Sequence, residues 1–138
     1  MKSLFFHAKD FGVEFHSLAN RPKNIVHEDL TNKTKQSCND CVVVFITVEK
    51  NDSEEVADKI VNEIIKMCNE VKRNKVVITP FAHLSNDLAE PIKGLEIIKL
   101  IESKIKESVE VLSVHFGSNK SLLLQTYGHV GNIRFREF

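Results

Sequence analysis

The sequence lacks the glycine-rich motifs that bind phosphates and dinucleotides, and it lacks the nucleophile elbow of the esterases. These absences disfavour kinases, nucleotide-dependent dehydrogenases and classical serine esterases. Lys plus Arg and Asp plus Glu number 19 each, so no excess of positive charge is available to bind long stretches of nucleic acid backbone. Any contact with RNA is therefore expected to be local.

Cysteines are few, and long apolar runs are missing. Three cysteines, an odd number, argue against a disulfide framework and favour a reducing compartment. Cys38 and Cys41 have the spacing of half a zinc knuckle, but no second pair follows, so we expect no metal and no cofactor. No apolar run is long enough for a signal peptide or a membrane span. We expect a soluble, cytoplasmic protein that makes no membrane contact.

A chain of 138 residues can bury the core of one domain, and we expect residues 1–138 to form it. The apolar runs Leu4–Ala8 and Val13–Leu18 flank turn-forming residues and predict a β-hairpin. Residues 19–40 show no clear period. The run Cys41–Val48 predicts a central strand, because it is apolar throughout and too short for a typical helix.

Two segments have the 3.6-residue period of amphipathic helices. The first is predicted over Ser53–Arg73 with Asp52 as its N-cap, and the second begins at Pro91 and ends near Glu107. The last part of the chain predicts a second hairpin, Val109–Phe116 with Lys120–Thr126, and a final strand, Asn132–Phe138. We therefore expect an α/β fold of α+β-like character, a mixed β-sheet with helices packed on one face.

The segment Lys75–Ser85 is the strongest candidate for a functional site. Its β-branched residues Val76–Ile78 predict a buried strand that ends near Pro80, because proline cannot donate to a sheet ladder. Ligand sites of open α/β sheets lie at the carboxyl ends of such strands. His83, in the loop that follows, and Lys120, after the turn at Gly117, are therefore predicted to face one cleft.

These same residues carry a resemblance to a known family. The sequence Pro-Phe-Ala-His-Leu-Ser at 80–85, followed by Phe116-Gly117 and by Lys120, resembles the amino-terminal editing domain of archaeal threonyl-tRNA synthetases. The resemblance continues at Phe6-His7, Val44–Glu49, Ser53–Glu55 and Gly128-His129. It implies a fold similar to D-aminoacyl-tRNA deacylases, a homodimer, and hydrolytic removal of serine from threonine tRNA.

The resemblance also implies roles for individual residues. Lys120 and His83 are the implied catalytic residues, with the tRNA's own 2′-hydroxyl helping to activate water. The implied substrate is the 3′ end of an aminoacyl-tRNA, whose terminal adenosine contacts mainly main-chain groups. The residues implied in substrate binding are Pro80, Phe81, Ala82, Phe116, Gly117, Glu49 and His7.

The chain departs from the family pattern in three places. Ser118 and Asn119 stand where relatives have aromatic residues, Ile133 stands at the place of an active-site glutamate, and Lys9 replaces an acidic residue near the start. A catalytically degenerate module that binds adenosine or an aminoacyl end therefore remains an alternative, as does a D-aminoacyl-tRNA deacylase. A synthetase catalytic module, in cis or in trans, is a further implied partner.

We also expect a homodimer from the distribution of apolar residues. Two helices can cover only one face of the sheet, so Leu122–Leu124 and Phe135 are left in need of apolar partners on the other face. A two-fold contact between identical chains is the commonest solution for such a surface.

Overall fold

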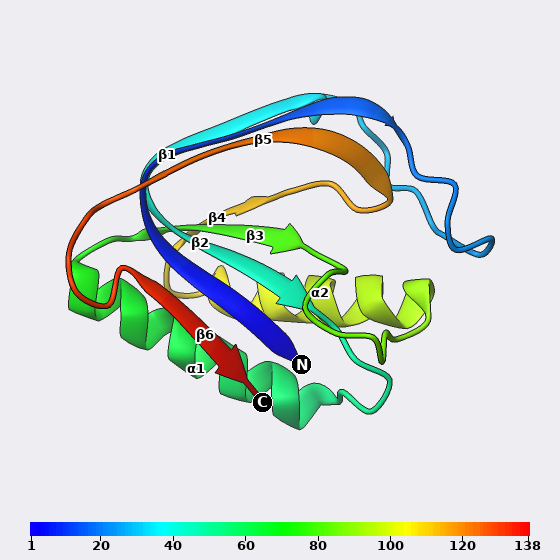
Figure 1. Ribbon diagram of the computed structural model, residues 1–138. Helices are drawn as coiled ribbons and strands as arrows, with labels where there is room; N and C mark the ends of the chain where they lie inside the picture. Colours follow the sequence, from blue (N-terminus) through cyan, green and yellow to red (C-terminus); the bar gives the residue numbers. More distant parts are fainter.

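The computed structural model describes residues 1–138 and shows a mixed six-stranded sheet with two helices on one face (Figure 1). This confirms the predicted α/β class. The elements are β1 (Lys2–Leu18), β2 (Lys35–Thr47), α1 (Glu54–Val71), β3 (Lys75–Pro80), α2 (Pro91–Ile105), β4 (Glu110–Ser113), β5 (Ser118–Thr126) and β6 (Ile133–Glu137).

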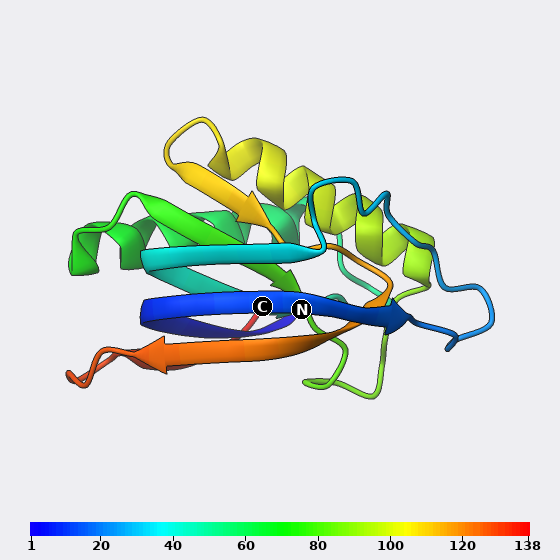
Figure 2. The same cartoon turned by 90° about the horizontal axis from the view of Figure 1, so that it is seen from above.

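The strands lie in the order β4-β3-β2-β1-β5, as Figure 2 shows from above. Strands β2, β3 and β4 run parallel, and β1 is antiparallel to β2, β5 and β6. The first part of β1 pairs with β6, and its second part pairs with β5. The final strand predicted at Asn132–Phe138 is therefore confirmed as β6.

The first predicted hairpin is wrong, because β1 is one continuous strand. Its register with β5 shifts between Ala8 and Asp10, so the sequence that resembles a turn forms a β-bulge. Gly12 lies in extended backbone opposite Ser37 of β2 and Leu123 of β5. Hydrogen-bonded partners on both sides keep the strand extended through these turn-forming residues.

The second predicted hairpin is also wrong. Strand β4 pairs with β3, whereas β5 pairs with β1 at the opposite end of the strand order. This is possible because β1, β2 and β5 bend over β3 and β4, so residues 114–117 can cross between the two edges (Figure 1). Lys120 consequently lies within β5 and not at the tip of a hairpin.

Strand β2 begins at Lys35, so residues 35–40 belong to the sheet and only residues 19–34 are irregular. Helix α1 has Ser53 as its N-cap, and the predicted cap at Asp52 is wrong. The Asp52 carboxylate instead accepts hydrogen bonds from the Met1 amine at 2.7 Å and from the Glu49 N–H at 2.6 Å. A charged donor makes the stronger bond, so this carboxylate ties β1 to the end of β2.

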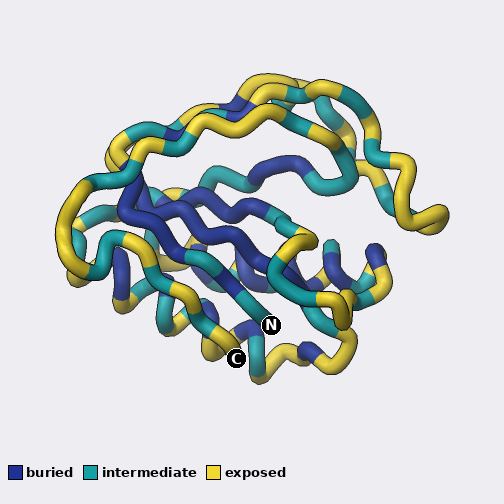
Figure 3. Tube along the Cα trace, in the orientation of Figure 1, coloured by how far each residue is buried: buried dark blue, intermediate teal, exposed yellow.

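The core has one apolar cluster on each face of the sheet. The larger cluster packs α1 and α2 against β1, β2 and β3 through residues such as Ile60, Ile98 and Ile78. The smaller one includes Phe11, Val43 and Val77 and lies beneath the curl of β1 and β2. In Figure 3 the buried residues gather along the middle of the sheet, and the curled outer part of the trace is mostly intermediate or exposed. No helix is both long and apolar enough to cross a membrane.

Candidate active site

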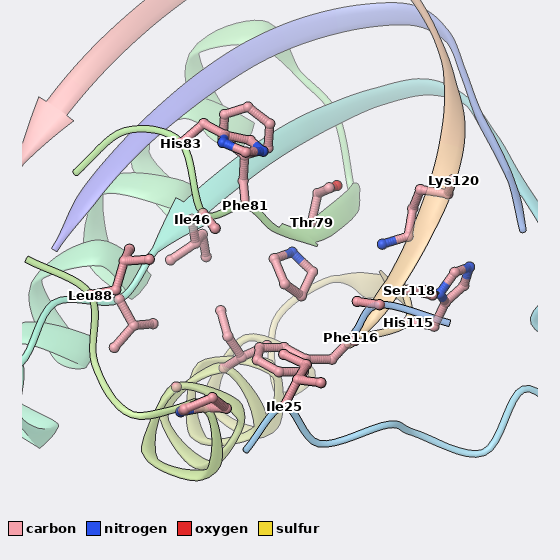
Figure 4. A pocket seen from close by; sticks show the side chains of 18 of the residues that line it. Ile25, Ile46, Thr79, Phe81, His83, Leu88, His115, Phe116, Ser118 and Lys120 are labelled. Carbon is pink, nitrogen blue, oxygen red and sulfur yellow. The ribbon is translucent and has the colours of Figure 1, made fainter. Parts of the chain in front are cut away.

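A cavity of about 530 Å³ lies at the carboxyl ends of β2 and β3. Its walls are the ends of these strands, the start of α2, the first part of β5 and residues of the 19–34 segment. Figure 4 shows His83 and Phe81 on one side of this cavity, with Lys120, Ser118 and His115 on the other. The predicted site residues that line it are Pro80, Phe81, Ala82, His83, Phe116, Gly117 and Lys120.

The loop after β3 is held in place from β2. The Phe81 N–H donates to the Ile46 carbonyl at 2.9 Å, and the Phe81 carbonyl accepts a short hydrogen bond from the Thr47 hydroxyl. The Phe81 ring packs on the Phe45 ring with centroids 5.1 Å apart, and the His83 ring meets Phe81 edge-on at 5.0 Å. The exposed His83 imidazole is therefore positioned through Phe81.

The turn at Gly117 requires glycine. Its φ is +80°, and a Cβ there would lie 2.1 Å from the Val26 carbonyl oxygen. The carbonyls of Gly117 and Phe116 accept hydrogen bonds from the N–H groups of Ala19 at 2.9 Å and Glu28 at 3.4 Å. The turn therefore holds the irregular 19–34 segment against the cavity.

Lys120 is a partly buried lysine without an ion pair. No carboxylate lies within 4.0 Å of its ammonium, and the group makes no hydrogen bond within the chain. Burial lowers the pKa of Lys120 below its usual range, and the more distant Glu28 carboxylate opposes the shift. Figure 4 shows the ammonium pointing into the cavity, where it can stabilise negative charge on a ligand.

His115 and Ser118 form a hydrogen-bonded pair beside Lys120 that the sequence did not predict. The Ser118 hydroxyl contacts the His115 Nδ1 atom. Burial, followed by the charge of Lys120, lowers the pKa of His115 to about 4, so the ring is neutral at pH 7. His115 Nε2 is buried without a hydrogen-bond partner. In the sequence, only the positions of His115 and Ser118 on either side of Gly117 indicated that the two side chains could meet.

Polar groups without partners occur elsewhere around the cavity. The Thr79 hydroxyl is buried, lines the cavity and makes no hydrogen bond. The N–H groups of Ala82, His83, Phe116 and Gly117 also make no hydrogen bond within the chain. An unpaired buried polar group costs about 1–3 kcal/mol, so a ligand that pairs with the Thr79 hydroxyl would recover part of that cost, and the four N–H groups are free to bind a polar ligand in place of water.

Two of the predicted site residues, Glu49 and His7, do not line the cavity. The Glu49 carboxylate accepts hydrogen bonds from the Met1 amine at 2.8 Å and from the Ser85 hydroxyl at 2.5 Å. These bonds lower the pKa of Glu49. Glu49 thus ties the chain start to the loop that carries His83, and its neighbour Val48 lines the cavity.

His7 lies on β1 against residues that follow β5. Its Nδ1 is 2.6 Å from His129 Nε2, and its ring packs on the Tyr127 ring at a centroid distance of 4.4 Å. Burial and the nearby Arg73 charge lower the pKa of His7. His7 therefore connects β1 to the β5–β6 connection.

The fold and the cavity define an α/β domain with a cavity beside an unpaired lysine. A profile of the Archaea-specific editing domain of threonyl-tRNA synthetase matches residues 1–137. The chain therefore belongs to this family.

Individual relatives agree with this assignment. The chain is 41% identical over 133 residues to the threonine-tRNA ligase of Staphylothermus marinus, covering 94% of this chain and 21% of the relative. It is 35% identical over 127 residues to the threonine-tRNA ligase editing subunit of Saccharolobus solfataricus, covering 91% of this chain and 31% of the relative. The chain thus spans between a fifth and a third of the length of these relatives.

A solved structure has the same fold at low sequence identity. The c-Myc DNA Unwinding Element Binding Protein superposes with a TM-score of 0.76 and 9% identity, covering 100% of this chain and 99% of that one. At this level of identity the likeness concerns the fold alone.

Proposed function

We propose that the chain hydrolyses the ester bond of L-serine wrongly attached to threonine tRNA. The observation that carries the proposal is the family membership, together with one cavity lined by the Pro80–His83 loop, the turn at Phe116-Gly117 and Lys120. A synthetase selects threonine over serine only weakly, because the methyl group that distinguishes them contributes only about 1–3 kcal/mol in a pocket. Hydrolytic editing removes the serine that is attached by mistake.

The 3′ end of the aminoacyl-tRNA would occupy the cavity. Its volume of about 530 Å³ lies within the usual range for small-ligand sites. Unpaired N–H groups of Ala82, His83, Phe116 and Gly117 are available to the terminal adenosine and the aminoacyl group. Main-chain recognition of this kind depends little on the neighbouring side chains, so it tolerates the replacement of aromatic residues by Ser118 and Asn119.

In the proposed reaction, water attacks the ester carbonyl carbon and the ribose oxygen leaves with a proton. Negative charge develops on the carbonyl oxygen, and the Lys120 ammonium stabilises it. The neutral His115 keeps the Ser118 hydroxyl beside this ammonium. His83 shapes the opposite wall, and the 2′-hydroxyl of the tRNA helps to activate the water.

The proposal extends to the assembly. Residues 1–138 would act as one domain, with a fold like that of D-aminoacyl-tRNA deacylases, and would work with a synthetase catalytic module in cis or in trans. The greater length of the relatives and the name of the editing subunit support this association. Leu123 and Phe135 are each at least half exposed, do not line the cavity and support a homodimer.

A second candidate is a module that binds an aminoacyl end without hydrolysing it. Ile133, at the place of the family's acidic residue, is half exposed on β6 and does not line the cavity. The cavity therefore receives no carboxylate from this strand. A preference for D-amino acids is a variant of the first candidate and differs only in substrate.

Incubation with L-seryl-, L-threonyl- and D-aminoacyl-tRNA separates these candidates. Preferential release of L-serine supports editing, and preferential release of a D-amino acid supports the variant. Background loss of every amino acid, combined with tight binding of a non-hydrolysable seryl-adenosine analogue, would replace the enzyme with the binding module. Background loss without binding would reject both.

A further inference from the structure

Cys38 and Cys41 lie on the same face of β2, although an odd spacing places residues of a regular strand on opposite faces. Asp40, between them, has a φ of 50° in the left-handed region. Cys41 pairs with Ala8 and Cys38 pairs with Phe11 in the β1–β2 register. Both cysteines consequently pack in the apolar cluster beneath the curl of the sheet.

The two cysteines lie close together but differ in exposure. Cys41 is buried, with its Sγ 3.8 Å from the Cys38 carbonyl oxygen, and Cys38 is partly exposed. No group of three His, Cys, Asp or Glu side chains suited to a metal ion occurs in the chain, so the pair lacks further metal ligands.

We propose that Cys38 and Cys41 form a reactive dithiol, which closes to a disulfide by exchange with a small-molecule disulfide. The Cys38 thiolate attacks one sulfur of the small disulfide and releases the first small thiolate, leaving a mixed disulfide on Cys38. Cys41 then attacks the Cys38 sulfur, and its proton leaves with the second small thiol. The dithiol is oxidised, and the small disulfide is reduced to two thiols.

Exposure assigns the two roles, because Cys38 is partly exposed and Cys41 is buried, and the electrostatics agree. Interaction with the Cys41 side chain lowers the pKa of Cys38 to about 7, against the effect of burial and with help from the Lys75 charge. The same interaction and burial raise the pKa of Cys41. Cys38 is therefore the accessible nucleophile, and Cys41 is the resolving thiol.

This site is separate from the cavity. Lys75 and Glu110, whose charges act on Cys38, are the first residues of β3 and β4. The cavity lies at the opposite, carboxyl ends of β2 and β3. The proposed exchange therefore does not depend on the proposed editing activity.

The third cysteine is an internal control. Cys68 is buried in α1, and burial raises its pKa to about 11. Trypsin cleavage after Lys35 and Lys50 places Cys38 and Cys41 in one peptide, residues 36–50, whereas Cys68 falls in residues 67–72. The state of the dithiol is therefore read from a single peptide.

The test treats the reduced chain of residues 1–138 with glutathione disulfide under native conditions. After iodoacetamide, unfolding and digestion, peptide 36–50 should have lost two hydrogen atoms and carry no carbamidomethyl group. Cys68 should remain a free thiol. A glutathione adduct that persists on Cys38, or a peptide 36–50 that does not react, would overturn the proposal.

Two variants assign the roles. Cys41→Ala should accumulate a stable mixed disulfide on Cys38, whereas the matched Cys68→Ala variant should close the disulfide like the wild type. Circular dichroism checks that both fold. If Cys41→Ala fails to fold, Cys38→Ala gives the same information, because the buried Cys41 should then stay unmodified. Fast modification of Cys41 in that variant would contradict the assigned roles.

Discussion

Replacing Lys120 by methionine removes the ammonium from the cavity while keeping most of the side chain's length. The charge has no ion pair to lose, and Met can bury the same apolar stem. We therefore expect the fold to be as stable as that of the wild type, or slightly more stable, because a desolvated charge without a partner is removed. We expect the effect to fall on turnover.

The size of the effect follows from the electrostatics of the cavity. A cation about 4 Å from an oxyanion contributes at most about 4 kcal/mol at an effective dielectric constant of about 20, which corresponds to about 1000-fold in rate. The cavity is open to water and part of this attraction already exists in the ground state, so a loss of about 10- to 1000-fold in turnover is expected.

Single-turnover deacylation of seryl-tRNA, with the enzyme in excess, measures this loss without a contribution from product release. Lys106→Met is the matched control, because Lys106 is exposed at the end of α2 and makes no ion pair. Its rate should equal that of the wild type. A Lys120→Met rate within twofold of wild type, in a variant of unchanged stability, would refute the role assigned to the ammonium.

Three further predictions concern stability and assembly. The pKa of His115 is about 4 in the folded state, whereas its usual value is 6.5. Between these two pH values the unfolded state binds more protons than the folded state, so the free energy of unfolding decreases as the pH falls. Denaturant unfolding at pH 7 and 4.5 should show a loss about 2 kcal/mol larger for wild type than for His115→Gln, and equal losses would contradict the buried neutral ring. Gly117→Ala should destabilise the fold by about 2–4 kcal/mol in the same assay, because the φ of Gly117 is positive and a backbone carbonyl blocks the added Cβ. Gly128→Ala is the control and should be nearly neutral, because a Cβ at Gly128 meets nothing within 4 Å. Leu123→Glu should convert a dimer to a monomer in light scattering at micromolar concentration. Ser103→Glu, at an exposed position of α2 away from β5, is the control, and a monomeric wild type would contradict the dimer.

The elements that were predicted correctly are those whose signal is local. Ile60, Ile64 and Met67 repeat at helical spacing and are buried on α1. The β-branched run of β3 is buried on both faces, and Pro80 is its last residue. Helix period and strand composition reflect burial of each segment against the sheet, so they can be recognised without knowing the topology.

Strand pairing could not be predicted in the same way. Turn-forming residues mark a change of direction, but they do not identify the partner strand. Gly12 lies inside β1 because β2 and β5 bond to that strand on both sides. Gly117 does form a turn, yet the strands on its two sides pair with β3 and β1 and not with each other.

The residues of the candidate site likewise fall into those recognised from local motifs and those that only the fold brings together. Residues of the Pro80–His83 loop, the turn at Gly117 and Lys120 were recognised from motifs and line the cavity. Thr79 and His115 were not, because their unpaired atoms become apparent only once the surrounding strands enclose them. The 19–34 segment also lacked a local signal, since it is held by hydrogen bonds to residues about 90 positions away.

The ratio of two deacylation rates, for serine and for threonine, tests the proposed editing function most directly. The chain is mixed in excess with L-seryl- or L-threonyl-tRNA, both made on threonine tRNA, and the release of each amino acid is followed over one turnover. We predict that serine is released well above the spontaneous rate and at least about 10-fold faster than threonine, which corresponds to about 1.4 kcal/mol of discrimination. Equal rates for the two substrates, or serine release at the spontaneous rate, would contradict the proposal that this cavity edits threonine tRNA.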